Sequence, residues 1–514
     1  MNMEKNDISD ELADEAVSRS PKEPHEQLGL DVNVDEAFIA VRGLRERTIL
    51  DESTNKRILR KIDFVLMPIL CIVYGLNYLD KTTLSYASIT GIQKGIGLKG
   101  NQFSWLGSIF YFGYLGFEYP AVRMLQRFPL AKYSGICIIA WGTTLACFST
   151  VKSFAGAVVV RLLLGVFEAS VSPGWVLFTS QWYTKKEQVV RVAWWGSFNG
   201  FAQIFGGLVA YGIAHNSTAD HFTLAPWKII YLFTGLLTIV FGIVFLLVIP
   251  DNQLNAWWLT KEDRILAIER VRGNQQGIGN KRFKSYQFKE ALLDPITWAF
   301  VLLTLCGDIP NGGLSNFFSL LLESFDLTAQ QSLLYGCISG AVEIAVLLGW
   351  AYTTRYFGNR ILWAVLGLVI SMVGAILLVA LPLGNNKGRL AGFYLAQFFV
   401  VAIVAIISLI ASNVAGYTKK VTVSGFFFIA YCVGNIIGPQ TFRAKAAPRY
   451  VPAEITLIVC YGLCIIDLLF IHWYYKQQNK KKLAEKNKEG YEKLENQEFL
   501  DLTDRENQEF VYEL

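Results

Sequence analysis

Residues 183–186 read Tyr-Thr-Lys-Lys, and residues 417–420 read Tyr-Thr-Lys-Lys again, an offset of 234 residues (417 minus 183). Each copy precedes an apolar stretch that is rich in glycine. The same offset maps Ile62, where the first long apolar run begins, onto Ile296, where the second half of the chain begins. We therefore read the chain as a duplication, which is typical of transporter folds whose substrate site lies between the two repeats.

The composition is that of a protein with many membrane spans. Of the 514 residues 53% are hydrophobic and 17% are charged, whereas a soluble domain carries about 25% charge. Apolar runs of about 20 residues predict spanning helices, and because these runs do not alternate apolar with polar residues, spanning β-strands are excluded. The predicted spans are 62–88, 103–122, 133–150, 155–178, 190–213, 227–249, 296–320, 332–354, 361–382, 391–414, 421–442 and 453–475. The predicted fold is all-α, with twelve transmembrane helices in two pseudo-symmetric six-helix bundles.

Several other classes of protein are excluded. The polar leader before residue 62 does not have the pattern of a cleavable signal peptide. All eight Cys fall inside predicted spans, where they read as packing residues and not as disulfides or metal ligands. The net charge of +5 comes without a basic cluster of the kind that binds nucleic acid. No nucleophile motif or metal-ligand cluster is present, so we expect no enzyme activity and no cofactor.

Charge in the short loops predicts the topology. Most basic loops lie on one side of the membrane, which places both termini in the cytoplasm. Asn216-Ser-Thr218 then lies outside, where Asn216 is a candidate for glycosylation. The expected organisation is a cytoplasmic N-terminal tail 1–61, an N-terminal bundle 62–249, a cytoplasmic central loop 250–295, a C-terminal bundle 296–475 and a cytoplasmic C-terminal tail 476–514.

Charged side chains inside the N-terminal spans are the first site candidates, because such groups are costly in a bilayer and face a cavity or a partner. They are Asp80, Lys81, Glu118, Arg161 and Glu168. In a functional interpretation Lys81 and Arg161 attract an anion, and Arg can bind the anion through two hydrogen bonds. Burial favours the neutral form of a carboxyl group, so Glu168 could bind and release a proton. In a structural interpretation these charges are ion pairs between helices, and Asp80 with Arg161 is one geometrically plausible pair. Glu118 lies near Arg123 and reads as a gate, packing or proton-coupling residue.

The C-terminal half offers fewer charges. Asp308, Glu343 and Asp467 lie in predicted spans, and Glu343 is a further candidate for proton coupling. In span seven, Pro310 and a glycine pair are expected to interrupt the helix and expose backbone groups to a cavity. The offset maps Asn311 onto Asn77. We include Asn77, Asn311 and Asn316 among the candidate substrate ligands.

Span ten lacks the charges of span four. It carries Tyr394 and Gln397 instead, which are candidates for a substrate-facing wall, although aromatic residues at this spacing are more often packing residues. The glycines of spans five and eleven are expected to let helices approach closely across the interface of the two halves.

The two polar segments outside the spans have simpler interpretations. The stretch Thr260–Arg272 in the central loop has the pattern of a helix. In the C-terminal tail, residues 495–499 and 506–510 both read Glu-Asn-Gln-Glu-Phe. A solvated tail is the simpler interpretation of that repeat, and a binding site for trafficking machinery is the alternative.

Together the motifs resemble the major facilitator superfamily and, within its anion:cation symporters, the fungal allantoate permease family. The motifs are Asn77-Tyr-Leu-Asp80-Lys81, Gly113-Tyr-Leu-Gly-Phe-Glu118-Tyr-Pro120, Arg161-Leu-Leu-Leu-Gly165-Val-Phe-Glu168, Pro250-Asp-Asn252, Gly416-Tyr-Thr-Lys-Lys420 and Gly434-Asn-Ile-Ile-Gly438-Pro439. The segments 442–450 and 499–504 look closest to the branch that holds a yeast permease regulated with thiamine. The chain differs from many members of the family at Lys81, where they have Arg. Lysine lacks the planar fork of arginine, so it does not offer the bidentate binding of an anion that arginine provides.

The resemblance implies alternating access and proton-driven import of a small organic anion, usually at the plasma membrane. The candidate substrates are ureides such as allantoate, other carboxylates, vitamin-like acids and sulfur-containing anions such as sulfonates or cysteine. The expected partners are this substrate, protons and membrane lipid, with the monomer as the working unit and no nucleic acid. A passive uniporter and a nutrient sensor of the same fold are the alternatives.

Overall fold

Helices build most of the described structure. The computed structural model describes residues 51–217, 224–272, 283–447, 449–487 and 502–514, and these residues form α-helices and short 3-10 helices joined by turns and loops, without a strand. Their apolar length is what a bilayer requires, since a spanning segment must satisfy all of its own backbone hydrogen bonds.

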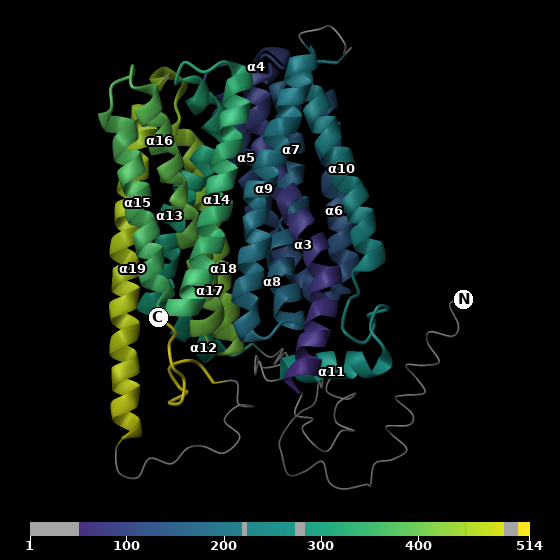
Figure 1. Ribbon diagram of the computed structural model, residues 1–514, viewed down its shortest axis with the longest axis vertical. Coiled ribbons are helices and arrows are strands. Elements are labelled where there is room, and N and C mark those ends of the chain that lie inside the picture. Colours follow the sequence, from purple (N-terminus) through teal and green to yellow (C-terminus); the bar gives the residue numbers. More distant parts are fainter. Residues whose placement is uncertain (1–50, 218–223, 273–282, 448, 488–501) are drawn as a thin grey trace, which may run out of the picture.

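The helices form two groups that stand side by side (Figure 1). The N-terminal bundle contains α3 (Glu52–Ile89), α5 (Gln102–Arg127), α6 (Leu130–Cys147), α7 (Phe154–Glu168), α8 (Val171–Trp182), α9 (Lys185–Ser217) and α10 (Pro226–Val248). The C-terminal bundle contains α13 (Pro295–Glu323), α14 (Ala329–Phe357), α15 (Arg360–Ala380), α16 (Asn386–Ala396), α17 (Val400–Asn413), α18 (Tyr417–Thr441) and α19 (Val451–Lys486). Short helices α4 (Ile92–Gly95), α11 (Lys261–Arg272) and α12 (Ser285–Leu293) lie outside the bundles. The predicted helix in the central loop is thus confirmed as α11.

The two bundles together cross the membrane twelve times. In this count α7 and α8 form one broken span, and α16 and α17 form another. In the described residues, nine such helices or pairs are long and apolar enough to cross a membrane, and α13 becomes a tenth together with α12. The other two crossings are α5 and α9, which are 26 and 33 residues long. These two helices pack against the opposite half of the molecule, α5 on α18 and α9 on α14, so they need less apolar surface toward lipid.

In the part of the chain that the structure describes, predicted spans four and ten are broken, and span seven is not. The prediction of an interrupted span seven is wrong, because α13 runs without a break through Pro310. Span four breaks directly after Glu168 instead. Pro173 explains this break, since its ring excludes a hydrogen bond to the carbonyl group four residues earlier. Span ten breaks in a comparable place, at the 3-10 turn Gln397–Phe399.

The two halves meet closely along their shared face. A Cβ atom on Gly200 of α9 would lie 2.3 Å from the carbonyl oxygen of Gly340 on α14, so only glycine permits this approach. The expectation for span five is therefore confirmed. The same expectation is wrong for span eleven. Gly434 and Gly438 of α18 pack against α13 of their own half and not against a helix of the other half.

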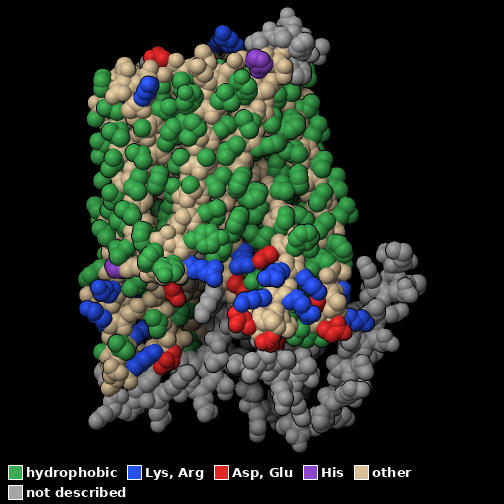
Figure 2. Space-filling view, in the orientation of Figure 1, with side chains coloured by type: hydrophobic (Ala, Val, Ile, Leu, Met, Phe, Trp, Pro, Cys, Tyr) green, Lys and Arg blue, Asp and Glu red, His purple; other side chains and the backbone are tan. Residues whose placement is uncertain are grey.

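Charge gathers at one end of the bundles. The face of the molecule in Figure 2 is covered between its ends by hydrophobic side chains, and Lys, Arg, Asp and Glu cluster at its lower end. We call the end that carries α11 and α12 the lower end, and the opposite end the upper end (Figure 1). All eight Cys lie in described residues and are free thiols.

Candidate functional site

Polar side chains collect near the middle of the helices where the two halves face each other. In the N-terminal half they come from α3 and from the last turn of α7, and in the C-terminal half from α13, α14 and α18. Buried polar groups in such a place need partners, because leaving a charge unpaired in a low-dielectric interior is costly.

Lys81 is the cation of this cluster. Its Nζ donates a hydrogen bond to Asn77 Oδ1 at 3.0 Å and lies 3.9 Å from Glu168 Oε2. Asn77 Nδ2 in turn donates to the same carboxylate oxygen at 2.5 Å. Glu168 is fully buried, whereas the side chain of Lys81 keeps 13% of its surface exposed. The structure thus brings together three residues that the sequence analysis selected, and the break after Glu168 places its carboxylate at the end of a helix.

Asp308 is the centre of a matching cluster in the other half. Its Oδ1 accepts hydrogen bonds from Asn311 Nδ2 and from Asn435 Nδ2, both at 3.1 Å. Its Oδ2 is buried and finds no hydrogen-bond partner among the described residues. Lys81 of the opposite half is close enough to Asp308 for their charges to interact. Lys81 therefore pairs with Glu168 of its own half and interacts over a longer range with Asp308 of the other half.

From the sequence, Asp308 is a charge inside a span without a predicted role. Its partner Asn435 is 127 residues away on α18, so no local pattern reveals the contact. A signal was nevertheless available, because Asn311, which the offset pairs with Asn77, lies one helical turn from Asp308. Each of these asparagines donates to a buried carboxylate, Asn77 to Glu168 and Asn311 to Asp308.

Arg161 and Asp80 form a separate unit. Arg161 Nη1 lies 4.0 Å from Asp80 Oδ1, and both side chains are buried. Asp80 Oδ2 accepts a hydrogen bond from Trp141 Nε1 at 2.9 Å, and Arg161 Nη2 donates to the Tyr231 hydroxyl at 3.1 Å. The partners Trp141 and Tyr231 belong to α6 and α10 of the same half. These contacts match the structural interpretation of the pair, since the partners of both charges lie inside the N-terminal bundle, although Asp80 Oδ1 and Arg161 Nε have no hydrogen-bond partner among the described residues.

The two remaining proton-coupling candidates lie apart from Lys81. Glu343 on α14 is buried and within hydrogen-bonding reach of Asn199 on α9, so this pair spans the two halves. Glu118 on α5 is also buried, and neither of its carboxylate oxygens has a hydrogen-bond partner among the described residues.

The other predicted ligands are placed as follows. Asn316 is buried and donates to the Gly312 carbonyl oxygen, and its side chain packs on Gly107 of the opposite half. Tyr394 donates to the Tyr335 carbonyl oxygen at 3.0 Å, a contact within the C-terminal half. Gln397 is half-buried on the 3-10 turn of span ten. Asn216 is exposed in the last turn of α9, and Thr218 of its motif lies outside the described residues.

Aromatic rings enclose the cluster, and the sequence analysis did not select them. Tyr431 of α18 contacts Tyr111 and Tyr114 of α5 across the two halves, with ring centroids 5.9 and 6.0 Å apart. Tyrosine at an interface combines a large apolar ring with a polar hydroxyl. A signal for these rings existed in the Gly113–Pro120 motif, which contains Tyr114.

Contacts between the halves concentrate toward the upper end. Ser104 and Ser108 of α5 donate to the carbonyl oxygens of Phe442 and Ile436. Phe103 packs edge-on against Phe317 at 5.2 Å. The structure is therefore closed between the bundles at the upper end.

The described residues contain no group of three or more His, Cys, Asp or Glu that could hold a metal ion. Among the described residues, the arrangement brings a lysine together with buried carboxyl groups and amide donors from both halves. Ionisable groups of this kind inside a membrane mark the paths of substrates, ions and protons.

Comparison with known proteins agrees with this architecture. Residues 70–439 match the Major Facilitator Superfamily. An uncharacterized transporter of Schizosaccharomyces pombe is 41% identical over 468 residues, which is 90% of this chain and 91% of the relative. In Saccharomyces cerevisiae, the thiamine pathway transporter THI73 is 37% identical over 503 residues (94% of each chain), and allantoate permease is 35% identical over 495 residues (94% of this chain and 90% of the permease).

Solved structures share the fold at low identity. The proton:xylose symporter XylE superposes with a TM-score of 0.64 at 13% identity, covering 82% of this chain and 96% of the symporter. A bacterial homologue of the lysosomal transporter Spinster superposes with a TM-score of 0.57 at 15% identity, covering 79% of this chain and 95% of the homologue. At these identities the likeness concerns the fold alone.

Proposed function

The chain belongs to the major facilitator superfamily of transporters, with fungal transporters such as allantoate permease among its relatives, and we propose that it imports a small organic anion together with protons. Like its named relatives, it is a transporter and not an enzyme. Allantoate is a carboxylate, so the name of that relative supports an anionic substrate here.

The position of Lys81 carries the proposal. It lies between the two halves, where transporters of this architecture bind their substrates, and its side chain is partly exposed beside a fully buried carboxylate. An ammonium group is a compact point charge that can bind a carboxylate or a sulfonate without a fixed orientation. Arg161 is already held by Asp80 and Tyr231, so we assign anion binding to Lys81 and a supporting role to Arg161.

Glu168 is the group that links the anion to a proton. While Glu168 is ionised it competes with the substrate for Lys81, and when Glu168 is protonated Lys81 is free for the anion. Protonation of Glu168 removes one negative charge from the site when the anion pairs with Lys81, which lowers the cost of closing the bundles around it. Glu118 and Glu343 remain secondary candidates for proton transfer. Asn77, Asn311, Asn316, Tyr394 and Gln397 are proposed as hydrogen-bonding neighbours of the substrate.

The orientation follows from the distribution of charge. We propose that the lower end, which carries most Lys and Arg (Figure 2), faces the cytoplasm, because basic loops stay on that side. Both termini are then cytoplasmic, the closed upper end faces outside, and Asn216 is on the side where glycosylation occurs. We propose the plasma membrane as the location, and domain boundaries near residues 61, 249, 295 and 475.

Uptake by cells that express the chain tests the proposal. Labelled ureides, monocarboxylates, vitamins, dipeptides, cysteine and sulfonates are supplied at pH 5 and pH 7.5, with and without a protonophore. We expect one class of anion to accumulate at pH 5 and the accumulation to collapse with the protonophore. Uptake that only equilibrates and ignores the protonophore would identify a uniporter instead, and binding without uptake would identify a sensor.

A further inference from the structure

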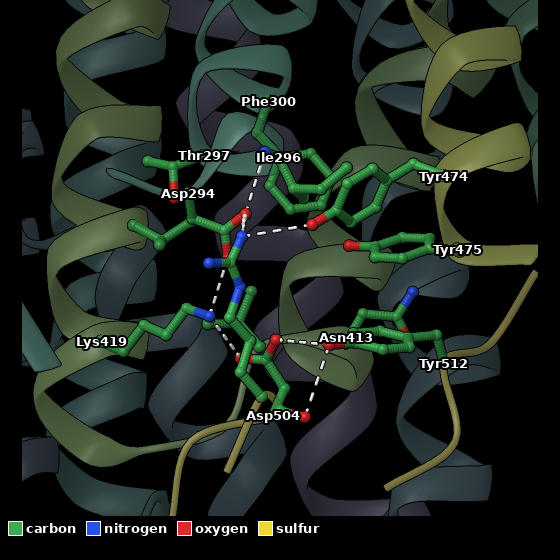
Figure 3. A pocket seen from close by; sticks show the side chains of 13 residues that line it. Asp294, Ile296, Thr297, Phe300, Asn413, Lys419, Tyr474, Tyr475, Asp504 and Tyr512 are labelled. Atoms are coloured by element: carbon green, nitrogen blue, oxygen red, sulfur yellow. Dashed lines mark hydrogen bonds and ion pairs between the residues drawn. The ribbon is translucent and has the colours of Figure 1, made fainter. Parts of the chain in front are cut away.

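The end of the chain is packed onto the lower end of the C-terminal bundle. The expectation of a solvated tail is wrong for residues 502–514, which we call the tail segment; the first copy of the Glu-Asn-Gln-Glu-Phe repeat, 495–499, lies outside the described residues. Thr503, Asp504 and Tyr512 of the tail segment are buried. Figure 3 shows Asp504 and Tyr512 beside Lys419, Asp294, Tyr474 and Tyr475, in a space whose remaining cavity is about 10 Å³. That volume is about the minimum that holds one water molecule, so the tail segment fills its site.

Lys419 is the centre of the contact. It belongs to the second copy of the Tyr-Thr-Lys-Lys repeat and is buried at the start of α18. Its Nζ lies 2.8 Å from Asp504 Oδ1 in the tail segment, 2.8 Å from Asp294 Oδ2 and 2.9 Å from Glu290 Oε1. Asp294 caps α13 through a hydrogen bond from the Ile296 amide. One lysine thus connects the tail segment to the first turns of α13 and α18 and to α12.

Tyr512 anchors the other side of the tail segment. Its ring stacks on Tyr475 of α19, with centroids 4.8 Å apart, and its hydroxyl donates to Asp504 Oδ2 at 2.8 Å. Asn479 of α19 binds both the backbone amide and the carbonyl oxygen of Tyr512, at 2.9 and 2.8 Å. Lys482 of α19 donates to the carbonyl oxygens of Asp504 and Asn507. Reciprocal backbone contacts of this kind fix one register of the segment.

The last residues reach two more helices. Glu513 forms an ion pair of 2.7 Å with Arg360 at the start of α15, and its amide donates to Asn413 Oδ1 at the end of α17 at 2.8 Å. Asn413 Nδ2 returns a hydrogen bond to the Glu513 carbonyl oxygen at 2.8 Å. The tail segment therefore touches the lower ends of α12, α13, α15, α17, α18 and α19. The contacts that we find between the tail segment and other described residues fall on these elements, or on Asp294 and Ala415 in the loops that join them, and not on the N-terminal bundle.

Helix α11 makes the corresponding contacts in the N-terminal half. Its Asp263 accepts from Arg57 at 2.8 Å and from Lys61 at 2.6 Å, both on α3. Its Arg270 forms an ion pair with Glu187 of α9, beside the first copy of the Tyr-Thr-Lys-Lys repeat. The second copy of the repeat is thus bound by the tail segment through Lys419, and α11 contacts Trp182 and Glu187, which flank the first copy.

We propose that the tail segment is a clamp that holds the lower ends of the C-terminal helices together as one body, and that α11 is its counterpart in the N-terminal bundle. Because its contacts stay within one half, the tail segment moves with the C-terminal bundle and does not lock the two bundles to each other. The inference concerns the bundle and not the substrate, so it stands apart from the proposed function.

Hydrogen–deuterium exchange of the purified full-length protein tests the clamp. We expect the amides of Tyr512 and Glu513 to exchange at least about tenfold more slowly than in a synthetic 502–514 peptide, because exchange of a packed segment requires local opening. Exchange as fast as in the peptide would overturn the proposal.

Variants identify the contacts responsible. Asp504→Ala and Tyr512→Ala should each release the tail segment and accelerate exchange in α12 and in the lower turns of α18 and α19. Val511→Ala is the matched control, because Val511 lies next to Tyr512 and is 67% exposed. Helix α11 should keep its exchange rate in all three variants. If both release variants left α12, α18 and α19 unchanged, or if α11 changed equally, the segment would not be a clamp of the C-terminal bundle.

Discussion

The hydroxyl of Ser85 lies 3.1 Å from the hydroxyl of Ser319, and the two serines are 234 residues apart, the same offset that relates the two Tyr-Thr-Lys-Lys segments. Equivalent residues of two repeats touch only on the axis that relates the repeats. The pseudo-symmetry axis of the molecule therefore passes between α3 and α13 at this pair. Both serines are fully buried, so this contact belongs to the closure of the upper end.

Ser85→Leu should open the upper end. A leucine side chain does not fit where two buried hydroxyl groups meet, so α3 and α13 have to separate. The probe is a cysteine introduced at Ser108, which is buried in the same closure. We expect this cysteine to react with an impermeant maleimide about tenfold faster, because destabilising the closed state by about 1.4 kcal/mol changes its equilibrium by that factor. Thr150→Leu is the control, because Thr150 is exposed at the same end. Equal labelling in the two variants would contradict the assignment of this contact to the closure.

Asp308→Asn should tighten binding of the anion and weaken its dependence on acid. While Asp308 is ionised it opposes an anion at Lys81. A like charge at intermediate distance and dielectric is worth about 1 kcal/mol, so we expect KM at pH 7.5 to fall about fivefold. The amide cannot titrate, and part of the stimulation by low pH should disappear. The measurement is uptake from pH 5 to pH 7.5, with Asp308→Glu as the control. A variant with unchanged KM and pH profile would remove Asp308 from the site.

Glu168→Gln should separate binding from accumulation. The glutamine keeps the hydrogen-bond acceptor for Asn77 Nδ2, so the fold is expected to persist while the proton-binding group is lost. We expect exchange of internal for external substrate to continue, and accumulation driven by a proton gradient to stop. Accumulation with the pH dependence of the unaltered protein would show that another group binds the proton.

Arg161→Met should destabilise the protein more than it changes substrate affinity. Removing one partner of a buried ion pair leaves Asp80 without its cation, which typically costs about 3–5 kcal/mol. The double variant Arg161→Met with Asp80→Asn should recover most of the loss in thermal unfolding, because no charge remains unpaired. A single variant that folds with normal stability but has lost substrate binding would instead identify Arg161 as a ligand.

The contribution of the Asp263 ion pairs to stability should not depend on pH above about 5. Burial disfavours the charged carboxylate, but the hydrogen bond and charge of Lys61 and the charge of Arg57 outweigh it, so the pKa of Asp263 is lowered. A lowered pKa means that the stabilisation is complete above the ordinary Asp value of about 3.9 and is lost only as pH falls through the lower value of the folded state.

The magnitude of the Asp263 contribution is expected to be small. Both cations are substantially exposed, at 58% and 40% of their side-chain surface, and such pairs are worth about 0.2–1 kcal/mol each. Asp263→Asn should therefore lower the thermal midpoint by the same small amount at pH 6 and at pH 8, as measured by thermal unfolding in detergent. A loss confined to pH 8 would contradict the lowered pKa.

Much of the site follows from residue type and position. Lys81, Asn77 and Glu168 were selected as charges and amides inside apolar spans, and the structure brings them into contact. The Asp80–Arg161 pair, which was geometrically plausible from the sequence, is present. Asp308 received no role because its contact with Asn435 depends on the packing of α13 on α18. The tail segment was misread because its partner Lys419 lies 85 residues earlier (504 minus 419).

The sequence by itself determined that this protein spans the membrane twelve times in two related halves. The reason is that a bilayer demands about 20 apolar residues per helix and internal satisfaction of every backbone hydrogen bond, and both demands are visible along the chain. Only the tertiary structure decided which carboxyl group faces which cation, where the helices break, and that the tail segment packs on Lys419. Those outcomes depend on how each helix is rotated against its neighbours, and a span that is apolar on most sides carries too little periodicity to reveal that rotation.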